Sequence, residues 1–495
     1  MKSAYLVILC TIISSISLTA QSNKQLTKEL DSYITDAVKL WQPPGLAVTV
    51  VKDGEIIFTN SYGVTTIGTN KAIDNNTLFG CMSTTKAFVA TGLAMLVDDG
   101  KLEWNDKVID YLPEFQLKDP YITRELNIKD LLTHRSGLGN TDYLWSMMNI
   151  SSDSALYKMR DVEKTYSLRS DFIYQNLFYL AAGKVIESIS GKSWGDFLKE
   201  RIYNPLGMTN TYATISQISN IENKADAHYE IDGDIVKIEQ LSADAIGPAG
   251  SMWSSITDIG KWVKFLINEG QVGDNSLIKP ETFNELFKPH QIVPPGQFYP
   301  TQQITKPNWT TYGLGWFQHD YNGKMVQFHT GSLPGMVAII GMIPDENVGV
   351  YVMGNLDHLE LRHAIMYSVF DLFTEGKLSR DWNKELYTLY NPESPEVVKP
   401  KQIKNAKPIL NESDFIGTYN NKLLGWVNIS NNNGSLAFNI NNTLKGSLTH
   451  WNYDTYQGAF DQKYRGKTPF LFRKNSNGKL DYLELFGERF DLCLN

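Results

Sequence analysis

The sequence predicts an α+β fold, an antiparallel sheet flanked by helices, followed by a small antiparallel β-barrel-like domain. Strand-like runs stand at both ends of the region up to residue 375, with mostly helix and loop between them. Short strands joined by Asn-Gly turns fill the region after residue 413. The first pattern is typical of one sheet covered by helices, and the second of a small all-β unit.

The first predicted elements are a hairpin and two helices. Residues 46–59 contain two β-branched runs on either side of Asp53-Gly54, which is a strong hairpin turn signal. Residues 84–99 and 176–190 show helical patterns, and each is followed by a glycine that can end a helix. Nine of the eleven residues from 87 to 97 are apolar, so we expect the first helix to be buried on all sides.

Three strand-like runs lie near the end of this region, separated by Gly and Pro turns. They cover residues 325–330, 336–343 and 349–353, and a helical pattern over about residues 356–373 follows them. We expect the early hairpin to pair with these late strands in one antiparallel sheet.

The chain changes in composition after residue 375. Pro392, Pro395, Pro400 and Pro408 interrupt a stretch rich in Lys and Glu, which predicts a linker. Alternating apolar residues and Asn-Gly turns then predict short antiparallel strands. The expected organisation is a signal peptide at 1–20, a first domain at 21–375, a linker at 376–412 and a small β-domain at 413–495.

The first twenty residues resemble a secretory signal peptide. Lys2 is their only charge, an apolar run extends from Ala4 to Ile13, and small residues lead up to Ala20. The apolar run is about half of the ~20 residues that span a bilayer, so no stable membrane span is expected. We therefore expect a periplasmic or secreted bacterial protein after cleavage.

Composition excludes several classes of protein. Apolar residues make up 42 % and charged residues 20 % of the 495 residues, which excludes a disordered chain, a collagen and a coiled coil. The net charge of −8 offers no basic excess for nucleic acid. Three cysteines and no paired Cys or His spacing predict neither a disulfide framework nor a metal site, and no cofactor is expected.

Ser83-Thr84-Thr85-Lys86 is the first candidate for chemistry. A serine and a lysine three residues apart share one face of a helix, and here the helix is predicted to be buried. A lysine in an apolar site has a lowered pKa and can take the proton of a serine nucleophile. The alternative is a helix cap followed by a lysine that reaches solvent, and Ser-x-x-Lys also occurs at Ser276 and Ser476.

Two later motifs complete the candidate site. Tyr174-Gln175-Asn176 offers a phenol that can relay protons and an amide that can orient a substrate, although packing and a helix cap would also explain it. His329-Thr330-Gly331-Ser332 ends a strand-like run, where Gly331 allows close approach to the backbone and the Ser332 N–H can stabilise an oxyanion. His329 could act as a donor or proton carrier at the pocket edge, and a histidine in a surface turn is the alternative.

In this order, the three motifs resemble those of the serine β-lactamase and penicillin-binding-protein superfamily, most closely its class C-like esterases, D-aminopeptidases and DD-peptidases. Further landmarks keep the order of that superfamily over roughly residues 25–375: Phe79-Gly80, Leu131–Leu138, Asn204–Met208, Pro248–Ser251 and Tyr312–Trp316. The resemblance implies an additional all-helical subdomain in the first domain. The segment around Phe415–Tyr419 and His450–Thr455 looks like the small lipocalin-like β-domains of some of these hydrolases.

The resemblance also implies the role of each residue. Ser83 would be the nucleophile, Lys86 its activating partner and Tyr174 a proton acceptor and donor, and the sequence leaves open which of the last two is the base. Asn176, His329, Gly331 and Ser332 would line the substrate site, with the Ser83 and Ser332 N–H groups as oxyanion hole.

His329 stands where antibiotic-hydrolysing and cell-wall-acting relatives typically have lysine, so we expect weak β-lactam hydrolysis. The expected substrates are small esters or peptides, including D-amino-acid peptides. A true β-lactamase, a DD-carboxypeptidase and a catalytically silent binding protein remain alternatives, and a homo-oligomer is left open.

Overall fold

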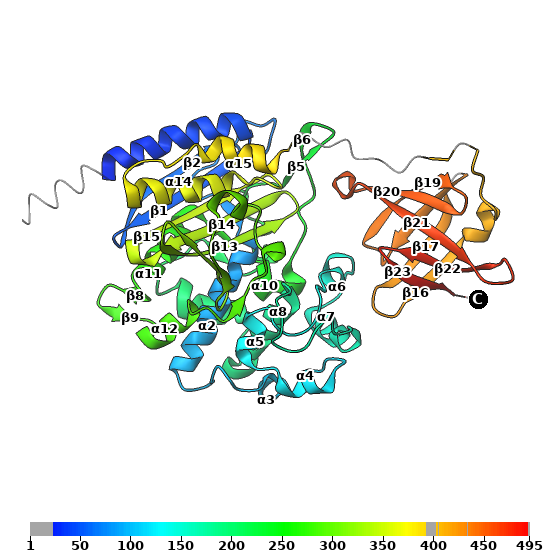
Figure 1. The fold of residues 1–495 in the computed structure, drawn as a ribbon, viewed down its shortest axis with the longest axis horizontal. Coiled ribbons are helices and arrows are strands. Elements are labelled where there is room, and N and C mark those ends of the chain that lie inside the picture. The colour runs from blue at the N-terminus through cyan, green and yellow to red at the C-terminus, as the bar shows by residue number, and fades with distance from the viewer. Residues whose placement is uncertain (1–22, 393–401, 404, 433, 494–495) are drawn as a thin grey trace, which may run out of the picture.

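The computed structural model describes residues 23–392, 402–403, 405–432 and 434–493. The expected signal peptide at residues 1–20 lies outside the described residues. Figure 1 shows a large first domain, in which helices pack around a sheet, and a separate small barrel formed by the C-terminal part of the chain.

The centre of the first domain is an eight-stranded antiparallel sheet. Two of its inner strands join the two ends of the domain, because Leu46 near the start of the domain pairs with Gly354 near its end. The predicted hairpin is confirmed, and it shares one antiparallel sheet with the three late strands, the last of which pairs with it directly. In spatial order the strands are β10 (Gln291–Ile292), β11 (Thr310–Tyr312), β12 (Phe317–Tyr321), β13 (Lys324–Leu333), β14 (Met336–Ile343), β15 (Val348–Gly354), β1 (Gly45–Lys52) and β2 (Glu55–Gly63).

Alternate residues of these strands enter two different cores. Val48 and Val50 of β1 pack with one helical layer, whereas Ala47 and Val51 pack with the opposite layer. This alternation follows from the two-residue period of a strand. The first layer contains the helix at residues 23–41 with α14 (Leu361–Glu375) and α15 (Trp382–Tyr390), and the second contains α2 (Thr85–Asp98), α8 (Asn176–Ser190) and α11 (Ile256–Ile267).

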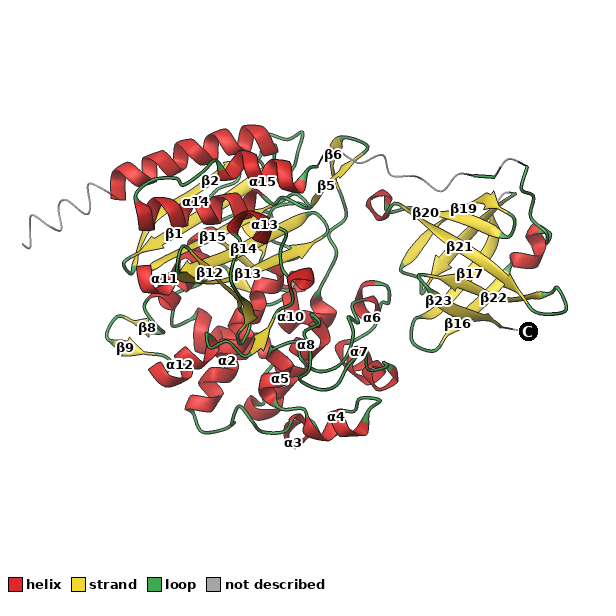
Figure 2. Ribbon diagram, in the orientation of Figure 1, coloured by secondary structure: helices red, strands yellow, loops and turns green. Residues whose placement is uncertain are grey.

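A group of helices on the far side of α2 and α8 forms the expected all-helical part (Figure 2). The two predicted helices that frame it are confirmed, and α2 is buried along nearly its whole length as its composition predicts. The other members are α3 (Val108–Tyr111), α4 (Pro120–Glu125), α5 (Ile128–Leu132), α6 (Tyr143–Ser146), α7 (Ser152–Lys158) and α9 (Trp194–Leu198).

Part of the expected linker at 376–412 is helical. Residues Trp382–Tyr390 form α15, and Trp382 and Leu386 are fully buried against the layer that contains α14. The sequence did not predict this short amphipathic helix, because only two of its side chains enter the core and prolines and charges surround them. Residues 393–401, with two of the four prolines inside them, lie outside the described residues.

The C-terminal unit is a closed antiparallel barrel of eight strands, which sharpens the expected barrel-like fold. The predicted turns join β17 to β18 and β21 to β22. Inward-facing residues of every second position fill the interior, among them Val427, Ile429, Phe438 and Phe470. The strands are β16 (Gly417–Asn421), β17 (Gly425–Asn432), β18 (Ser435–Ile440), β19 (Leu444–Asn452), β20 (Thr455–Phe460), β21 (Lys467–Lys474), β22 (Leu480–Leu485) and β23 (Glu488–Leu492).

Two further observations concern the described residues as a whole. None of their helices combines the length and the apolar character that crossing a membrane requires. Nor do the described ranges bring three or more His, Cys, Asp or Glu side chains together as a metal site would.

Candidate active site

Ser83 lies in a short 3₁₀ helix, Met82–Thr84, between β3 (Leu78–Gly80) and α2. The sequence placed this serine at the opening of the long helix, and the structure places it in the turn just before. Met82 has a φ of 51°, which is the left-handed region that a side chain rarely adopts. This sharp turn leaves Ser83 partly accessible while Lys86, one helical turn on, is fully buried.

The Lys86 amine touches two of the predicted site residues. Its Nζ lies 3.0 Å from Ser83 Oγ and 2.8 Å from Asn176 Oδ1. A third contact, 2.7 Å long, joins it to the carbonyl oxygen of Ala249 in the short helix α10 (Gly247–Gly250). The structure therefore brings the first and second motifs together around one buried nitrogen.

Burial lowers the pKa of Lys86 to about 7, and the nearby Asp142 carboxylate partly opposes this shift. A neutral amine has two N–H donors and one lone pair. The carbonyl oxygens of Asn176 and Ala249 can only accept, so they take the two N–H groups. The lone pair is then left for the Ser83 hydroxyl, which is the arrangement that a general base requires.

The ring of Tyr174 lies close to the Lys86 amine. The centroid of its ring is 4.9 Å from Lys86 Nζ, and its hydroxyl is buried. Burial raises the pKa of Tyr174 well above 10, although the neighbouring Ser83 hydroxyl opposes this rise. A tyrosinate is therefore disfavoured here, and the neutral phenol is placed to pass a proton on.

The third motif runs beside the serine. A Cβ atom on Gly331 would lie 3.0 Å from the Ser83 backbone nitrogen and 2.5 Å from the Cys81 carbonyl oxygen, so only glycine fits. Arg362 is buried and donates from Nη1 to the Gly331 carbonyl at 2.6 Å and to Ser332 Oγ at 2.8 Å. This arginine fixes the end of β13 next to the nucleophile.

His329 is engaged within the protein, which differs from the expected donor at the pocket edge. It is 1 % exposed, its Nδ1 donates to the Thr330 carbonyl at 2.6 Å, and its Nε2 accepts from Tyr312 Oη at 2.9 Å. Tyr312 in turn lies 3.3 Å from His134 Nε2, while His134 Nδ1 accepts from the Gln175 N–H. Both histidines are held neutral, and burial with the Lys86 charge lowers the pKa of His329 to about 3.

Sequence reasoning interpreted His134 as structural and gave no role to two further residues that shape the site, Asp142 and Arg362. Asp142 accepts from Asn176 Nδ2 at 2.8 Å, which orients the amide so that its oxygen faces Lys86. Arg362 carried one signal, because Glu360 and Arg362 stand as an ion pair at the start of a mostly apolar helix. Asp142 carried none, since its role depends on a contact between segments that are distant in sequence.

Comparisons with known proteins identify the family of the first domain. Residues 30–369 match the Beta-lactamase family, and residues 401–492 match a domain of unknown function, DUF3471. The chain belongs to the beta-lactamase family. Members of this family are hydrolases, and the match takes in all three predicted motifs.

Individual relatives are distant from this beta-lactamase family member. "Unguisins hydrolase ungD" of Aspergillus violaceofuscus is 28 % identical over 354 residues, which is 67 % of this chain, and the chain spans 61 % of that hydrolase. An octameric penicillin-binding protein homologue from Pyrococcus abyssi is similar in structure over 94 % of this chain and 99 % of its own, with a TM-score of 0.63 and 21 % identity.

A second solved structure shares the fold of the family domain. It is the D-amino acid amidase from Ochrobactrum anthropi SV3, complexed with L-phenylalanine amide. The match covers 72 % of this chain and 98 % of the amidase, with a TM-score of 0.56 and 24 % identity. At these identities both solved structures show the fold alone.

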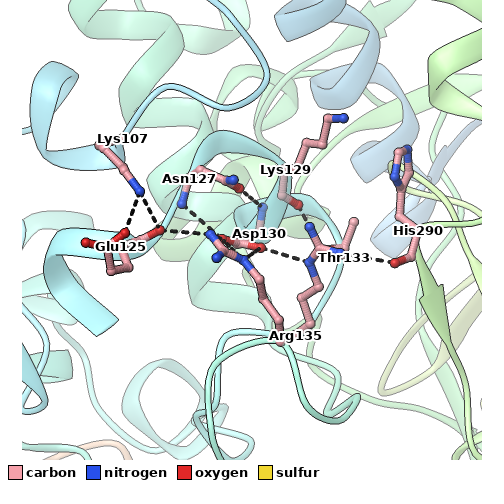
Figure 3. Close-up of polar contacts among 9 residues, drawn as sticks. Lys107, Glu125, Asn127, Lys129, Asp130, Thr133, Arg135 and His290 are labelled. Carbon is pink, nitrogen blue, oxygen red and sulfur yellow. Dashed lines mark hydrogen bonds and ion pairs between the residues drawn. The ribbon is translucent and has the colours of Figure 1, made fainter. Parts of the chain in front are cut away.

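A buried carboxylate, Asp130, supports the candidate active site of this beta-lactamase family member. Asp130 in α5 is fully buried and accepts from Arg135 Nε at 2.8 Å (Figure 3). It also accepts from Arg169 Nη2 at 2.7 Å. Its carboxylate also accepts from the Asn127 backbone N–H and so caps the helix. His134, whose φ is 58°, lies directly between this helix and Arg135. The network therefore fixes the turn that holds His134 against the second motif.

Replacing Asp130 with Ala is expected to lower the free energy of unfolding by about 3 kcal/mol, because two guanidinium groups lose their partner and a helix loses its cap. Urea unfolding followed by circular dichroism measures the change. Asp153→Ala is the matched control, since Asp153 is 82 % exposed in its ion pair with Lys184. Equal stability of the two variants would contradict a supporting role of the Asp130 network.

Proposed function

We propose that this protein is an exported serine hydrolase that acts on small esters or peptides, including D-amino-acid peptides, through an acyl-enzyme. The observation that carries this proposal is the position of the Lys86 amine. It is buried, its Nζ lies 3.0 Å from Ser83 Oγ, and two carbonyl oxygens accept its other hydrogen bonds. Export rests on the signal-peptide pattern of the first twenty residues.

In the acylation step, Ser83 Oγ attacks the substrate carbonyl carbon as its proton moves to the Lys86 lone pair. The backbone N–H groups of Ser83 and Ser332 stabilise the negative oxygen that forms. The ester or amide bond then breaks as the proton held by Lys86 passes through Tyr174 to the leaving group, which departs and leaves Ser83 acylated. Water then attacks the acyl group by the same route and releases Ser83.

The charges around the site support the substrate class. An ammonium group at position 329 would hold a substrate carboxylate, whereas the neutral and fully engaged His329 holds none. Uncharged acyl groups are therefore favoured over β-lactams, which carry a carboxylate. The likeness in fold to a D-amino acid amidase makes D-amino-acid amides and peptides a reasonable part of the test.

A fluorophosphonate probe and a substrate panel test the proposal. We expect mass spectrometry to locate the probe on the peptide that contains Ser83. p-Nitrophenyl acetate should be hydrolysed faster than nitrocefin, with D-Ala p-nitroanilide as the peptide-like substrate. Nitrocefin turnover equal to that of the ester would favour a true β-lactamase. Ligand binding without labelling or turnover would favour a silent binding protein.

The rate should rise with pH through the titration of Lys86. Its protonated form cannot accept the Ser83 proton, so kcat/KM is expected to be low below pH 6 and to increase with a midpoint near the Lys86 pKa of about 7. The groups that face this amine are the Asp142 carboxylate, the neutral His134 and His329, and the phenols Tyr174 and Tyr179. Flat kcat/KM for p-nitrophenyl acetate between pH 5 and 8.5 would contradict Lys86 as the base.

A further inference from the structure

Three consecutive residues before α6 contact the three residues of the second motif one by one. Asn140 Nδ2 donates to the Tyr174 carbonyl at 3.2 Å. Thr141 Oγ1 donates to the side chain of Gln175 at 2.5 Å, and Asp142 accepts from Asn176 at 2.8 Å. The segment Asn140–Asp142 thus sets the position of the whole Tyr-x-Asn motif.

Asp142 also determines how the Asn176 amide is turned. A carboxylate can only accept hydrogen bonds, so the Asn176 NH₂ group must face Asp142 and the amide oxygen must face Lys86. Trp145 of α6 holds the same carboxylate oxygen through its indole N–H at 2.9 Å. The position of α6 therefore decides where this negative charge lies relative to the Lys86 amine.

The barrel also contacts helix α6. Tyr143 at the start of α6 and Met147 directly after its end pack against the hydrophobic core of the barrel. In the reverse direction, Leu423 in the turn between β16 and β17 packs against the core of the catalytic domain. Asn441 Nδ2 of the barrel donates to the Met147 carbonyl at 3.3 Å. Figure 1 shows α6 and α7 on the side of the catalytic domain that faces the barrel.

Helix α7 adds polar contacts to this interface. Lys158 Nζ donates to the carbonyl oxygens of Lys422 and Leu423, both at 3.2 Å. In the opposite direction, Lys422 Nζ forms an ion pair with Asp161 Oδ1 at 2.7 Å. The turn between β16 and β17 is therefore joined to the catalytic domain on both of its sides.

We propose that the barrel serves the active site by holding α6, so that Asp142 acts as a positioning residue for Asn176 and Lys86. The path runs from the barrel through α6 to Asp142, and from there through the Asn176 amide to the amine beside Ser83. This inference rests on the proposed serine-hydrolase function, and it gives the DUF3471 region a task in catalysis.

The charge of Asp142 is tested by two substitutions in the full chain. Asp142→Asn keeps an oxygen that can accept from Asn176 but removes the charge that favours protonated Lys86. The rate of inactivation by the fluorophosphonate should then reach its midpoint at a pH lower by about 0.5–1 unit. Asp142→Ala also frees the Asn176 amide, so its maximal rate should fall about tenfold or more. Unchanged pH midpoints and rates in both variants would overturn the positioning role.

The barrel contact is tested by the double variant Leu423→Ser with Lys158→Ala. We expect a rate lowered about three- to tenfold and a pH midpoint shifted in the direction of Asp142→Asn. Ile416→Ser with Lys445→Ala, at two exposed barrel positions, is the matched control and should behave as wild type. A double variant with wild-type rate and midpoint would overturn the inference.

Two further results separate the ways in which the inference can fail. If thermal unfolding shows that Leu423→Ser weakens the barrel, Lys158→Ala alone tests the same interface, because it removes only two surface hydrogen bonds. Its shift in pH midpoint should then have the same sign, and no shift would count against the inference. Wild-type protein that is neither labelled nor active would instead overturn the proposed function, and the inference with it.

Discussion

Replacing Ser83 with Ala is expected to abolish fluorophosphonate labelling and to lower kcat/KM for p-nitrophenyl acetate by about 10⁴-fold or more. Without the hydroxyl no acyl-enzyme can form, and the oxyanion donors alone give only weak catalysis. The nearby Cys81 offers no substitute nucleophile, because it is buried and burial raises the pKa of its thiol to about 12. Intact-protein mass spectrometry after probe treatment gives the first readout, and steady-state kinetics the second.

The chain supplies its own control for this substitution. Ser276 begins another Ser-x-x-Lys sequence, but it lies in the short exposed strand β9 (Asn275–Ser276). Ser276→Ala should therefore label and turn over as wild type does. Labelling that persists in Ser83→Ala, or that disappears in Ser276→Ala, would contradict the assignment of the nucleophile.

Replacing Lys86 with Met should lower kcat/KM by about 10³-fold or more, since general-base assistance and the orientation of Ser83 are lost together. Methionine fills a similar volume without a charge, so the fold is expected to persist in spite of two carbonyl oxygens losing a donor. The increase of rate with a midpoint near pH 7 should disappear, because it belongs to the Lys86 amine.

Two comparisons sharpen the result for Lys86. Lys86→Arg keeps a cation that cannot lose its proton, so it should be as inactive as the Met variant. Lys279→Met changes the lysine of the second Ser-x-x-Lys sequence and should leave kcat/KM unaltered. A Met variant that retains a tenth of the wild-type rate with the same pH midpoint would assign the base to another group, with Tyr174 the nearest candidate.

Much of the fold could be predicted because its signals are local. The Asp53-Gly54 hairpin, the apolar helix after Ser83 and the alternating strands of the barrel each carry their pattern within about fifteen residues. The strands β10 to β12 escaped prediction because they are short and interrupted by polar residues. Helix α15 escaped because prolines and charges surround its two buried side chains.

The residues of the candidate site also fall into those that a local pattern predicts and those that it does not. Ser83, Lys86, Tyr174 and Asn176 could be named because motif order identifies them, and the structure places them in one cluster. Residues whose position depends on tertiary contacts could not be found. Asp142 approaches Asn176 from a loop that lies over thirty residues earlier in the chain, and buried His329 accepts a hydrogen bond from Tyr312 of β11, two strands away in the sheet.

The pairing of β1 with β15 governs the order in which the molecule can fold. These two strands lie roughly 300 residues apart in the chain, so the sheet cannot close until nearly the whole first domain has left the ribosome. Until then the edge of β1 that faces away from β2 lacks its partner and is open to aggregation or to chaperones. The contact of β13 with the Ser83 turn depends on the same closure. Hydrolytic activity should therefore emerge late and abruptly during refolding, after most of the helical structure has formed.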